Sequence, residues 1–299
     1  MLKGFVITPP IIGRISIGRV VEKNGKRLPE KDDQFTITTQ VQNHDGWLLH
    51  PAHEAELKRT QTAKLRAIQI MLPFNDPDLN LRAEYAQFDR QTGRPIAVSD
   101  GVTCQRRTSQ GMETVTCAST QDCCLRLADT KPYGRLYVKV GGGDDLGVFI
   151  FRTTSYNSIR TLAARLRYYA AVSGGLLATL PLELKLRSKS TTQSYRTPIY
   201  YVDLVIRDDM ALPEAIQAAR QADAARQAQG FDQAALDEAA RLGFGNGSFE
   251  DTEDDLSTVA EEFFPEQSGA EPAPTASDQH LQPRSLADKL KDKTEKAAA

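Results

Sequence analysis

The 299-residue sequence has few of the features that mark a membrane protein, an exported protein or a common class of enzyme. It contains no run of about 18 consecutive apolar residues, which excludes a hydrophobic transmembrane helix. No apolar stretch of the kind found in signal peptides follows Met1. We therefore expect a cytoplasmic protein with no membrane partner.

Several catalytic signatures are also missing. The sequence has no Gly-x-x-x-x-Gly-Lys-Ser/Thr phosphate loop and no Gly-x-Ser-x-Gly nucleophile elbow. The glycines at 141–143 precede two acidic residues, which would repel a phosphate group. Acidic pairs such as Asp32-Asp33 lie in turn-like contexts, where aspartate is favoured because it hydrogen-bonds locally. We therefore predict that the protein is not an enzyme and keep a metal-dependent hydrolase as an alternative.

Histidine is scarce, and three of the four histidines surround the single tryptophan, Trp47. His50 and His53 form a His-x-x-His-Glu pattern that offers metal ligands, but Pro51 separates them and no His-Glu-x-x-His helix is present. We interpret these histidines, together with His44, as solvated loop residues, with metal ligation as the alternative.

The four cysteines all lie in a predicted loop at residues 100–130, as Cys104, Cys117 and the adjacent pair Cys123 and Cys124. Clustered cysteines in a cytosolic chain favour a metal over a disulfide framework. Their spacing is not a double Cys-x-x-Cys, and adjacent side chains diverge along an extended chain. We predict a structural zinc ion held by Cys104, Cys117 and one or both of the adjacent pair. A degenerate metal loop and incidental free thiols are the alternatives.

The net charge of −2 conceals a strong asymmetry along the chain. Residues 1–207 contain 29 Lys and Arg against 19 Asp and Glu, whereas residues 208–299 contain 8 against 20. A basic body followed by an acidic tail is typical of proteins that bind nucleic acid. The alternative is a generic domain with a solvating tail.

The clearest secondary-structure pattern runs from Lys131 to Ser190. Alternating apolar residues, a glycine-acid turn and a continuous apolar run at 148–152 predict two strands, the second covered on both faces. Apolar residues spaced by three or four predict a helix over 155–173, and Gly174 suits its C-terminal cap. A further apolar run follows. We predict an α+β fold, with a mostly antiparallel sheet packed by this central helix.

Composition divides the sequence into three predicted parts. Residues 1–207 form the α+β body, residues 208–244 form an Ala-rich helical segment, and residues 245–299 form a disordered acidic tail. Within the tail, Phe263 and Phe264 stand among acidic residues. We interpret them as a docking motif that contacts the basic body or a partner protein, with a plain solubility tail as the alternative.

One face of the predicted central helix is basic. Arg160 and Arg167 lie on it with Arg165 at its edge, beside Tyr168. Cations next to an aromatic ring suit unpaired nucleic-acid bases, so we predict a nucleic-acid or partner surface here. A solvated helix face is the alternative.

Three stretches carry a resemblance to a known family. They are the opening at residues 4–15, the segment Lys131-Pro132-Tyr133-Gly134-Arg135-Leu136 after the cysteines, and the block from Gly147 to Ile159. Together they resemble the phage-type recombination directionality factor-like (Gp3-like) family, some members of which are labelled "hydrolase or metal-binding protein". The resemblance covers roughly residues 1–207.

This resemblance implies an accessory protein of mobile-element DNA recombination. Such a protein binds a recombinase or integrase together with DNA, and it controls the direction of site-specific recombination without cutting DNA. A metal-binding cysteine set is typical of the family, but Thr130 stands where a fourth cysteine is expected. That departure moves the fourth ligand to the adjacent cysteine pair. A single-stranded-DNA-binding module of an element-encoded repair or annealing system is the alternative function.

Overall fold

The computed structural model describes residues 9–23, 26–44, 46–117, 129–141, 147–190 and 198–243, together with residues 259 and 263. Within 19–32 it describes the backbone alone. The chain divides into a unit of residues 1–268 and a unit of residues 269–299, and every described residue belongs to the first. Among the described residues, no helix has the length and apolarity needed to cross a membrane.

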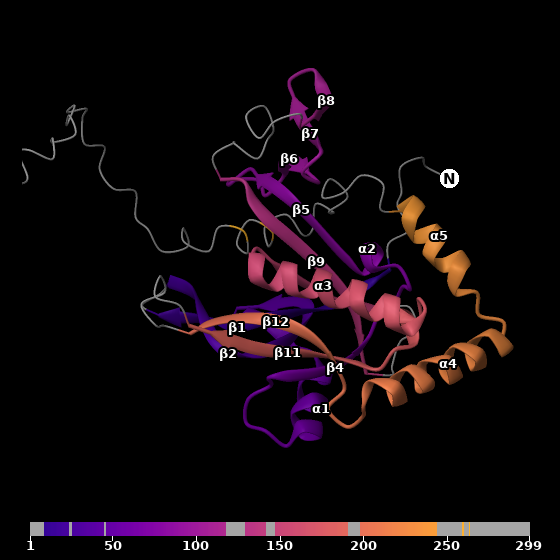
Figure 1. Cartoon of the computed structure of the whole chain (residues 1–299). Coiled ribbons are helices and arrows are strands. Elements are labelled where there is room, and N and C mark those ends of the chain that lie inside the picture. Colours follow the sequence, from indigo (N-terminus) through magenta and orange to yellow (C-terminus); the bar gives the residue numbers. More distant parts are fainter. Residues whose placement is uncertain are drawn as a thin grey trace, which may run out of the picture. The chain divides into compact units, whose positions relative to one another are not determined.

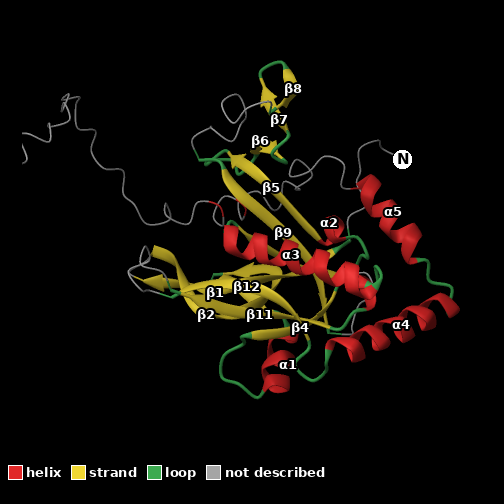
Figure 2. Ribbon diagram, in the orientation of Figure 1, coloured by secondary structure: helices red, strands yellow, loops and turns green. Residues whose placement is uncertain are grey.

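The described chain consists mainly of strands, with helices inserted between some of them and two helices after the last strand (Figures 1 and 2). The strands are β1 (Ile11–Lys23), β2 (Lys26–Asn43), β3 (Gly46–Leu49), β4 (Ala67–Met71), β5 (Leu81–Phe88), β6 (Pro95–Ser99), β7 (Thr103–Thr108), β8 (Gly111–Thr116), β9 (Lys131–Val140), β10 (Val148–Thr153), β11 (Leu182–Lys189) and β12 (Ile199–Ile206). The helices are α1 (Pro51–Thr60), α2 (Pro77–Asn80), α3 (Tyr156–Ser173), the 3-10 turn η2 (Leu177–Thr179), α4 (Leu212–Ala228) and α5 (Gln233–Gly243).

These strands form one 12-stranded sheet with a branch. Its main path runs in the order β3-β2-β1-β10-β9-β5-β6-β7-β8, and β4 joins β9 to the pair β11 and β12. The pairing of β1 with β10 is parallel, whereas the other pairings among described strands are antiparallel. The predicted α+β fold with a mostly antiparallel sheet is therefore confirmed.

Helix α3 packs across one face of this sheet, as the sequence pattern predicts (Figure 2). Its buried residues Leu162 and Leu166 join the main core with Leu136 of β9. The hydroxyl oxygen of Ser155 accepts from the backbone N–H of Ser158 and caps the N-terminus. Gly174 ends the helix in the left-handed conformation, with φ 73°.

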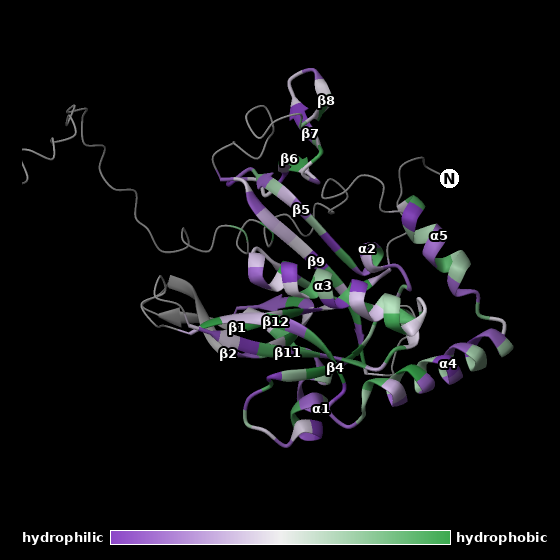
Figure 3. Ribbon diagram, viewed as in Figure 1, coloured by the Kyte–Doolittle hydropathy of each residue, from purple (hydrophilic) through white to green (hydrophobic). Residues whose placement is uncertain are grey.

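The opposite face of the central strands is also covered. Tyr137, Val148 and Ile150 are buried in a second cluster with Ala240 of α5. The continuous apolar run of β10 follows from this arrangement, because both of its faces lack contact with water. Helix α4 contributes Ala215 and other small residues to the main core. Both Ala-rich helices alternate hydrophobic and hydrophilic residues along their length (Figure 3).

The cysteine region differs from its prediction as a loop. Strands β6, β7 and β8 occupy much of residues 95–116, where β7 and β8 form an antiparallel hairpin. Most of the hairpin's side chains are exposed, and many are polar. Because neither face of the hairpin needs to be apolar, its sequence lacks the alternation of apolar residues that predicts a strand.

Candidate interaction surfaces

Three neighbouring strands place arginines side by side on one face of the sheet. Arg82 of β5 is paired with Arg135 of β9, which is paired in turn with Arg152 of β10. Arg14 of β1 is paired with Ile150 of β10. Ile150 and Arg152 are two positions apart on one strand, so Arg14 lies on the same face as Arg152. We call these four residues the arginine row. It faces away from α3, because the neighbouring Gly134 is the residue that meets that helix.

The arginine row is largely buried. The side chains of Arg135 and Arg82 are 1% and 9% exposed, and their Nη2 atoms lie 3.5 and 3.6 Å from the same oxygen of Glu84. The guanidinium of Arg14 lies 4.4 Å from the centroid of the Trp47 ring, in a cation–π contact. The row therefore concentrates positive charge on this face, which favours anionic groups near it.

An aromatic cluster adjoins the arginine row. Ala86 and Phe88 of β5 and Tyr133 of β9 are buried together, and we call them the aromatic seat. The ring of Phe263, itself fully buried, lies 4.8 Å from that of Phe88 and 6.1 Å from that of Tyr133, edge to face. The Nζ of Lys131 donates to the backbone oxygen of Phe263 at 3.0 Å. A segment of the acidic tail region thus reaches the body at this point.

The predicted docking motif consists of two phenylalanines, of which the structure describes one. Phe263 occupies the aromatic seat, whereas Phe264 lies outside the described residues. The contact partners of Phe263 were not predicted from the sequence. Finding them required the register of β5 against β9, which brings Ala86 opposite Lys131.

The predicted basic stripe lies on the outer side of α3. Arg160 and Tyr168 are exposed, and Tyr168 packs edge to face on Tyr169 at 5.6 Å. Arg167 is 72% exposed and lies 3.7 Å from the exposed carboxylate of Asp78. These side chains are accessible to a ligand in solution.

Arg165 differs from the rest of the stripe because it is committed to an internal ion pair. Its Nε donates to Asp203 Oδ1 at 3.0 Å, and the Nε of Arg187 donates to Asp203 Oδ2 at 2.7 Å. The Asp203 side chain is only 3% exposed. Burial raises the pKa of Asp203, but the two arginine hydrogen bonds outweigh it and hold the pKa below its usual value. Arg165 therefore contributes to the fold as well as to the surface.

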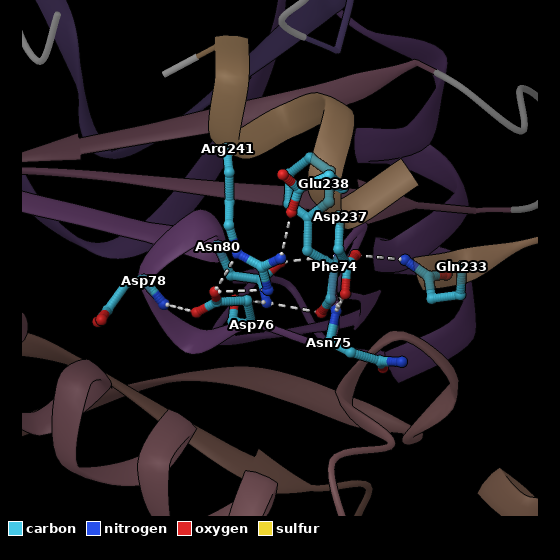
Figure 4. A network of polar contacts seen from close by, with 9 residues as sticks. All are labelled: Phe74, Asn75, Asp76, Asp78, Asn80, Gln233, Asp237, Glu238 and Arg241. Atoms are coloured by element: carbon cyan, nitrogen blue, oxygen red, sulfur yellow. Dashed lines mark hydrogen bonds and ion pairs between the residues drawn. The ribbon is translucent and has the colours of Figure 1, made fainter. Parts of the chain in front are cut away.

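A polar network connects α5 to the segment between β4 and β5 (Figure 4). Asp237 accepts from Gln233 Nε2 at 2.8 Å and from the backbone N–H of Asn75 at 3.3 and 3.4 Å. Arg241 donates from Nε and Nη2 to Asp76 Oδ2, each at 3.2 Å. Burial raises the pKa of Asp237 above its usual value. This network fixes the position of α5 against the segment between β4 and β5. No local sequence pattern predicts that position.

Two of the four predicted zinc ligands can be located. Cys104 is buried on β7, and Cys117 follows β8 with its Sγ 3.7 Å from Ser99 Oγ. Both cysteines are disulfide-bonded, a state in which neither is a free thiolate. Cys123 and Cys124 lie outside the described residues. Within the described part of the chain, no three His, Cys, Asp or Glu side chains converge on a metal position. The zinc site stays a prediction.

The histidines near Trp47 have structural contacts. His50 caps α1, where its Nδ1 accepts from the backbone N–H of Ala52 at 3.1 Å. His53 lies within α1, not in a loop, and its Nδ1 accepts from the backbone N–H of Ile37 at 3.4 Å. Burial lowers the pKa of both histidines, which keeps them neutral and able to accept these bonds.

The family model described as "Gp3-like: Recombination directionality factor-like" matches residues 12–207. The matched segment begins in β1 and ends just after β12, so it includes the sheet and α3. The chain belongs to this recombination directionality factor-like family. No curated protein and no solved structure matches it.

Proposed function

We propose that this protein is an accessory factor of mobile-element DNA recombination. It binds a recombinase or integrase on DNA and controls the direction of site-specific recombination. The family match across residues 12–207 carries this proposal, because it spans the whole sheet rather than one short motif. The exposed basic stripe on α3 supports it, since such a stripe suits anionic or protein surfaces.

A reconstituted reaction tests the proposal. The integrase encoded by the same element would be given integration-type and excision-type pairs of sites, with and without this protein. We expect the protein to suppress integration and stimulate excision. An unchanged direction and yield across a range of protein concentrations would reject the proposal.

The DNA part of the proposal rests on α3. Changing Arg160 and Arg167 together to Gln would weaken oligonucleotide binding and lower the salt slope by about 1.4–1.8, for two phosphate contacts. Arg220, an exposed arginine on α4, provides the matched Arg220→Gln control. Fluorescence anisotropy at several salt concentrations measures both effects. An equal loss of oligonucleotide affinity in the double variant and in the control would show that α3 does not contact DNA.

Single-stranded DNA binding is the second candidate function. The observation that favours it is Tyr168, which is 52% exposed, follows Arg167 directly and offers a ring on which a base can stack. Replacing Tyr168 by Leu would weaken binding to an unpaired oligonucleotide much more than binding to a duplex. Equal effects on both would instead favour backbone contacts alone.

We also propose a structural zinc ion bound by Cys104, Cys117 and the pair Cys123 and Cys124, whose thiolates would be typical zinc ligands. Redox conditions would then decide whether Cys104 and Cys117 are disulfide-bonded or bind zinc. Metal analysis of untagged protein, purified under reducing conditions without chelator, should give about one zinc per chain. Less than about a tenth of an equivalent would reject the site.

A further inference from the structure

Two residues of the acidic tail region, Val259 and Phe263, meet the body. Val259 and Phe263 both have helical backbone and are fully buried in the same cluster. Residues four apart share one face of a helix, so both side chains point toward the aromatic seat. Aliphatic and aromatic anchors at this spacing are typical of helices that bind in a groove.

The aromatic seat recognises more than an apolar side chain. Lys131 Nζ lies 5.3 Å from the ring centroid of Phe263 while donating to its backbone oxygen. The same lysine thus contacts the ring of Phe263 through a cation–π interaction and its main chain through a charged hydrogen bond. Ring geometry toward Phe88 and Tyr133 adds a preference for an aromatic residue over an aliphatic one.

Charge complements the apolar contacts. Arg135 lies beside the aromatic seat, with its guanidinium 5.7 Å from the Tyr133 ring, and Lys131 lies on the same strand. The tail sequence near the anchors is strongly acidic. Its acidic residues from 250 to 262 are Glu250, Asp251, Glu253, Asp254, Asp255, Glu261 and Glu262. The ammonium group of Lys131 next to the aromatic seat therefore matches an acidic helix that carries a phenylalanine.

We propose that the aromatic seat and Lys131 form a docking site for a short acidic helix in which a phenylalanine follows an aliphatic residue by four positions. Val259 and Phe263 fill this site within the chain. A partner protein with a helix of the same pattern displaces them and binds in their place. This inference goes beyond the proposed function, because it requires neither a recombinase nor DNA.

The connection through residues 244–258 sets the strength of the competition. A short tether gives an effective concentration of about 1 mM, so a helix that binds the open site with a Kd of about 10 μM is weakened about 100-fold by the occupied one. Removing the internal anchor should therefore strengthen binding of an external helix. A site that served only to stabilise the fold would not respond in this way.

Direct binding measurements test the proposal on the full-length chain. The probe is a fluorescent peptide with the sequence of residues 249–268, titrated with the wild-type protein and with Phe263→Ala. We expect the variant to bind the peptide at least about tenfold more tightly, because its site is no longer filled by its own tail. Equal binding to both proteins, or binding to neither, would overturn the proposal.

Matched variants separate docking from general effects. Phe231→Ala removes an aromatic residue that contacts Arg226 elsewhere, and it should leave peptide binding at the wild-type level. A peptide with alanine in place of Phe263 should not bind. Adding Lys131→Gln to Phe263→Ala should reduce the gained affinity several-fold. Binding of the control peptide equal to that of the probe would overturn the proposal.

Thermal unfolding and nucleic-acid binding complete the experiment. If Phe263→Ala lowers the Tm too far for titration, Val259→Ala deletes the smaller anchor and should give a weaker gain in the same direction. A variant that gains affinity for a DNA oligonucleotide, but none for the peptide, would show a nucleic-acid surface and overturn the proposal. Because no recombinase is present, these outcomes are independent of the recombination assay.

Discussion

The Nζ atom of Lys131 donates a 3.0 Å hydrogen bond to the backbone oxygen of Phe263, which lies 132 positions further along the chain. The bond joins β9, in the centre of the sheet, to a segment rich in acidic residues. In the sequence, the only sign of this contact is a pair of phenylalanines among acidic residues. The structure thus gives the tail region a defined point of contact with the body.

Changing Lys131 to Met removes this bond and the cation–π contact but keeps the apolar stem. We expect the docked segment to lose about 1–3 kcal/mol of protection, since the hydrogen bond is made by a charged group. Amide hydrogen exchange at Val259 and Phe263 should accelerate by at least about fivefold. Lys185→Met, which removes an ion pair to Asp208 elsewhere, should leave that exchange unchanged. Equal exchange in both variants would contradict the assigned contact.

Asp203 holds two arginines from different elements, and changing it to Asn should destabilise the fold by about 2–3 kcal/mol at pH 7. The folded-state pKa of Asp203 is lowered, so its contribution is present above the unfolded pKa and lost as pH falls through the folded pKa. Urea denaturation should show the gap between wild type and variant closing below about pH 4. Asp209→Asn, at an exposed pair with Arg207, is the control and should change little.

Asp237 should give the opposite dependence on pH. Burial raises its folded-state pKa, so its contribution is fully present below the unfolded pKa of about 3.9 and is lost as pH rises through the folded pKa. The stability of Asp237→Asn relative to wild type should therefore improve from about pH 3.5 to pH 7. Parallel urea titrations of both proteins measure this trend. A relative stability that falls over the same interval would contradict the assigned environment.

Gly13 allows β1 to approach its neighbours closely. An added Cβ would lie 2.5 Å from Phe149 Cε1 and 2.6 Å from the backbone oxygen of Thr38. Gly13→Ala should therefore cost about 1–3 kcal/mol through overpacking. Gly134→Ala is the control, because its nearest neighbour is the side chain of Ile159, which can shift. Chemical denaturation should rank Gly13→Ala as the more damaging change, and the reverse order would contradict this account.

Local patterns in the sequence were sufficient to predict the central unit. The apolar run of β10, the spacing of apolar residues in α3, and the glycine after Ser173 correctly predicted two strands and α3 with its C-terminal cap. These signals are local, because a helix or strand carries its own periodicity and its own end residues. The fold class followed from them.

The candidate surfaces depended on contacts that no local pattern contains. Alternation in β9 indicated that Arg135 and Leu136 face opposite sides, but it did not show which neighbours each side would meet. The arginine row appears only once the register of four strands is known. The docking of α5 similarly depends on Asp237 and Asn75, which are 162 positions apart. Sequence spacing contains no information on such distant hydrogen bonds.

The parallel pairing of β1 with β10 has a consequence for how the chain assembles. Ile15 aligns with Phe151, so the first hairpin can join the remaining sheet only after synthesis has passed residue 153. Until then its inner edge exposes unsatisfied backbone groups to other chains emerging nearby. Such distant pairings also slow folding, since a long loop must close, at a cost in entropy, before the stabilising contacts between the strands can form. Efficient production of this protein should therefore depend on chaperones that shield the nascent amino-terminal hairpin.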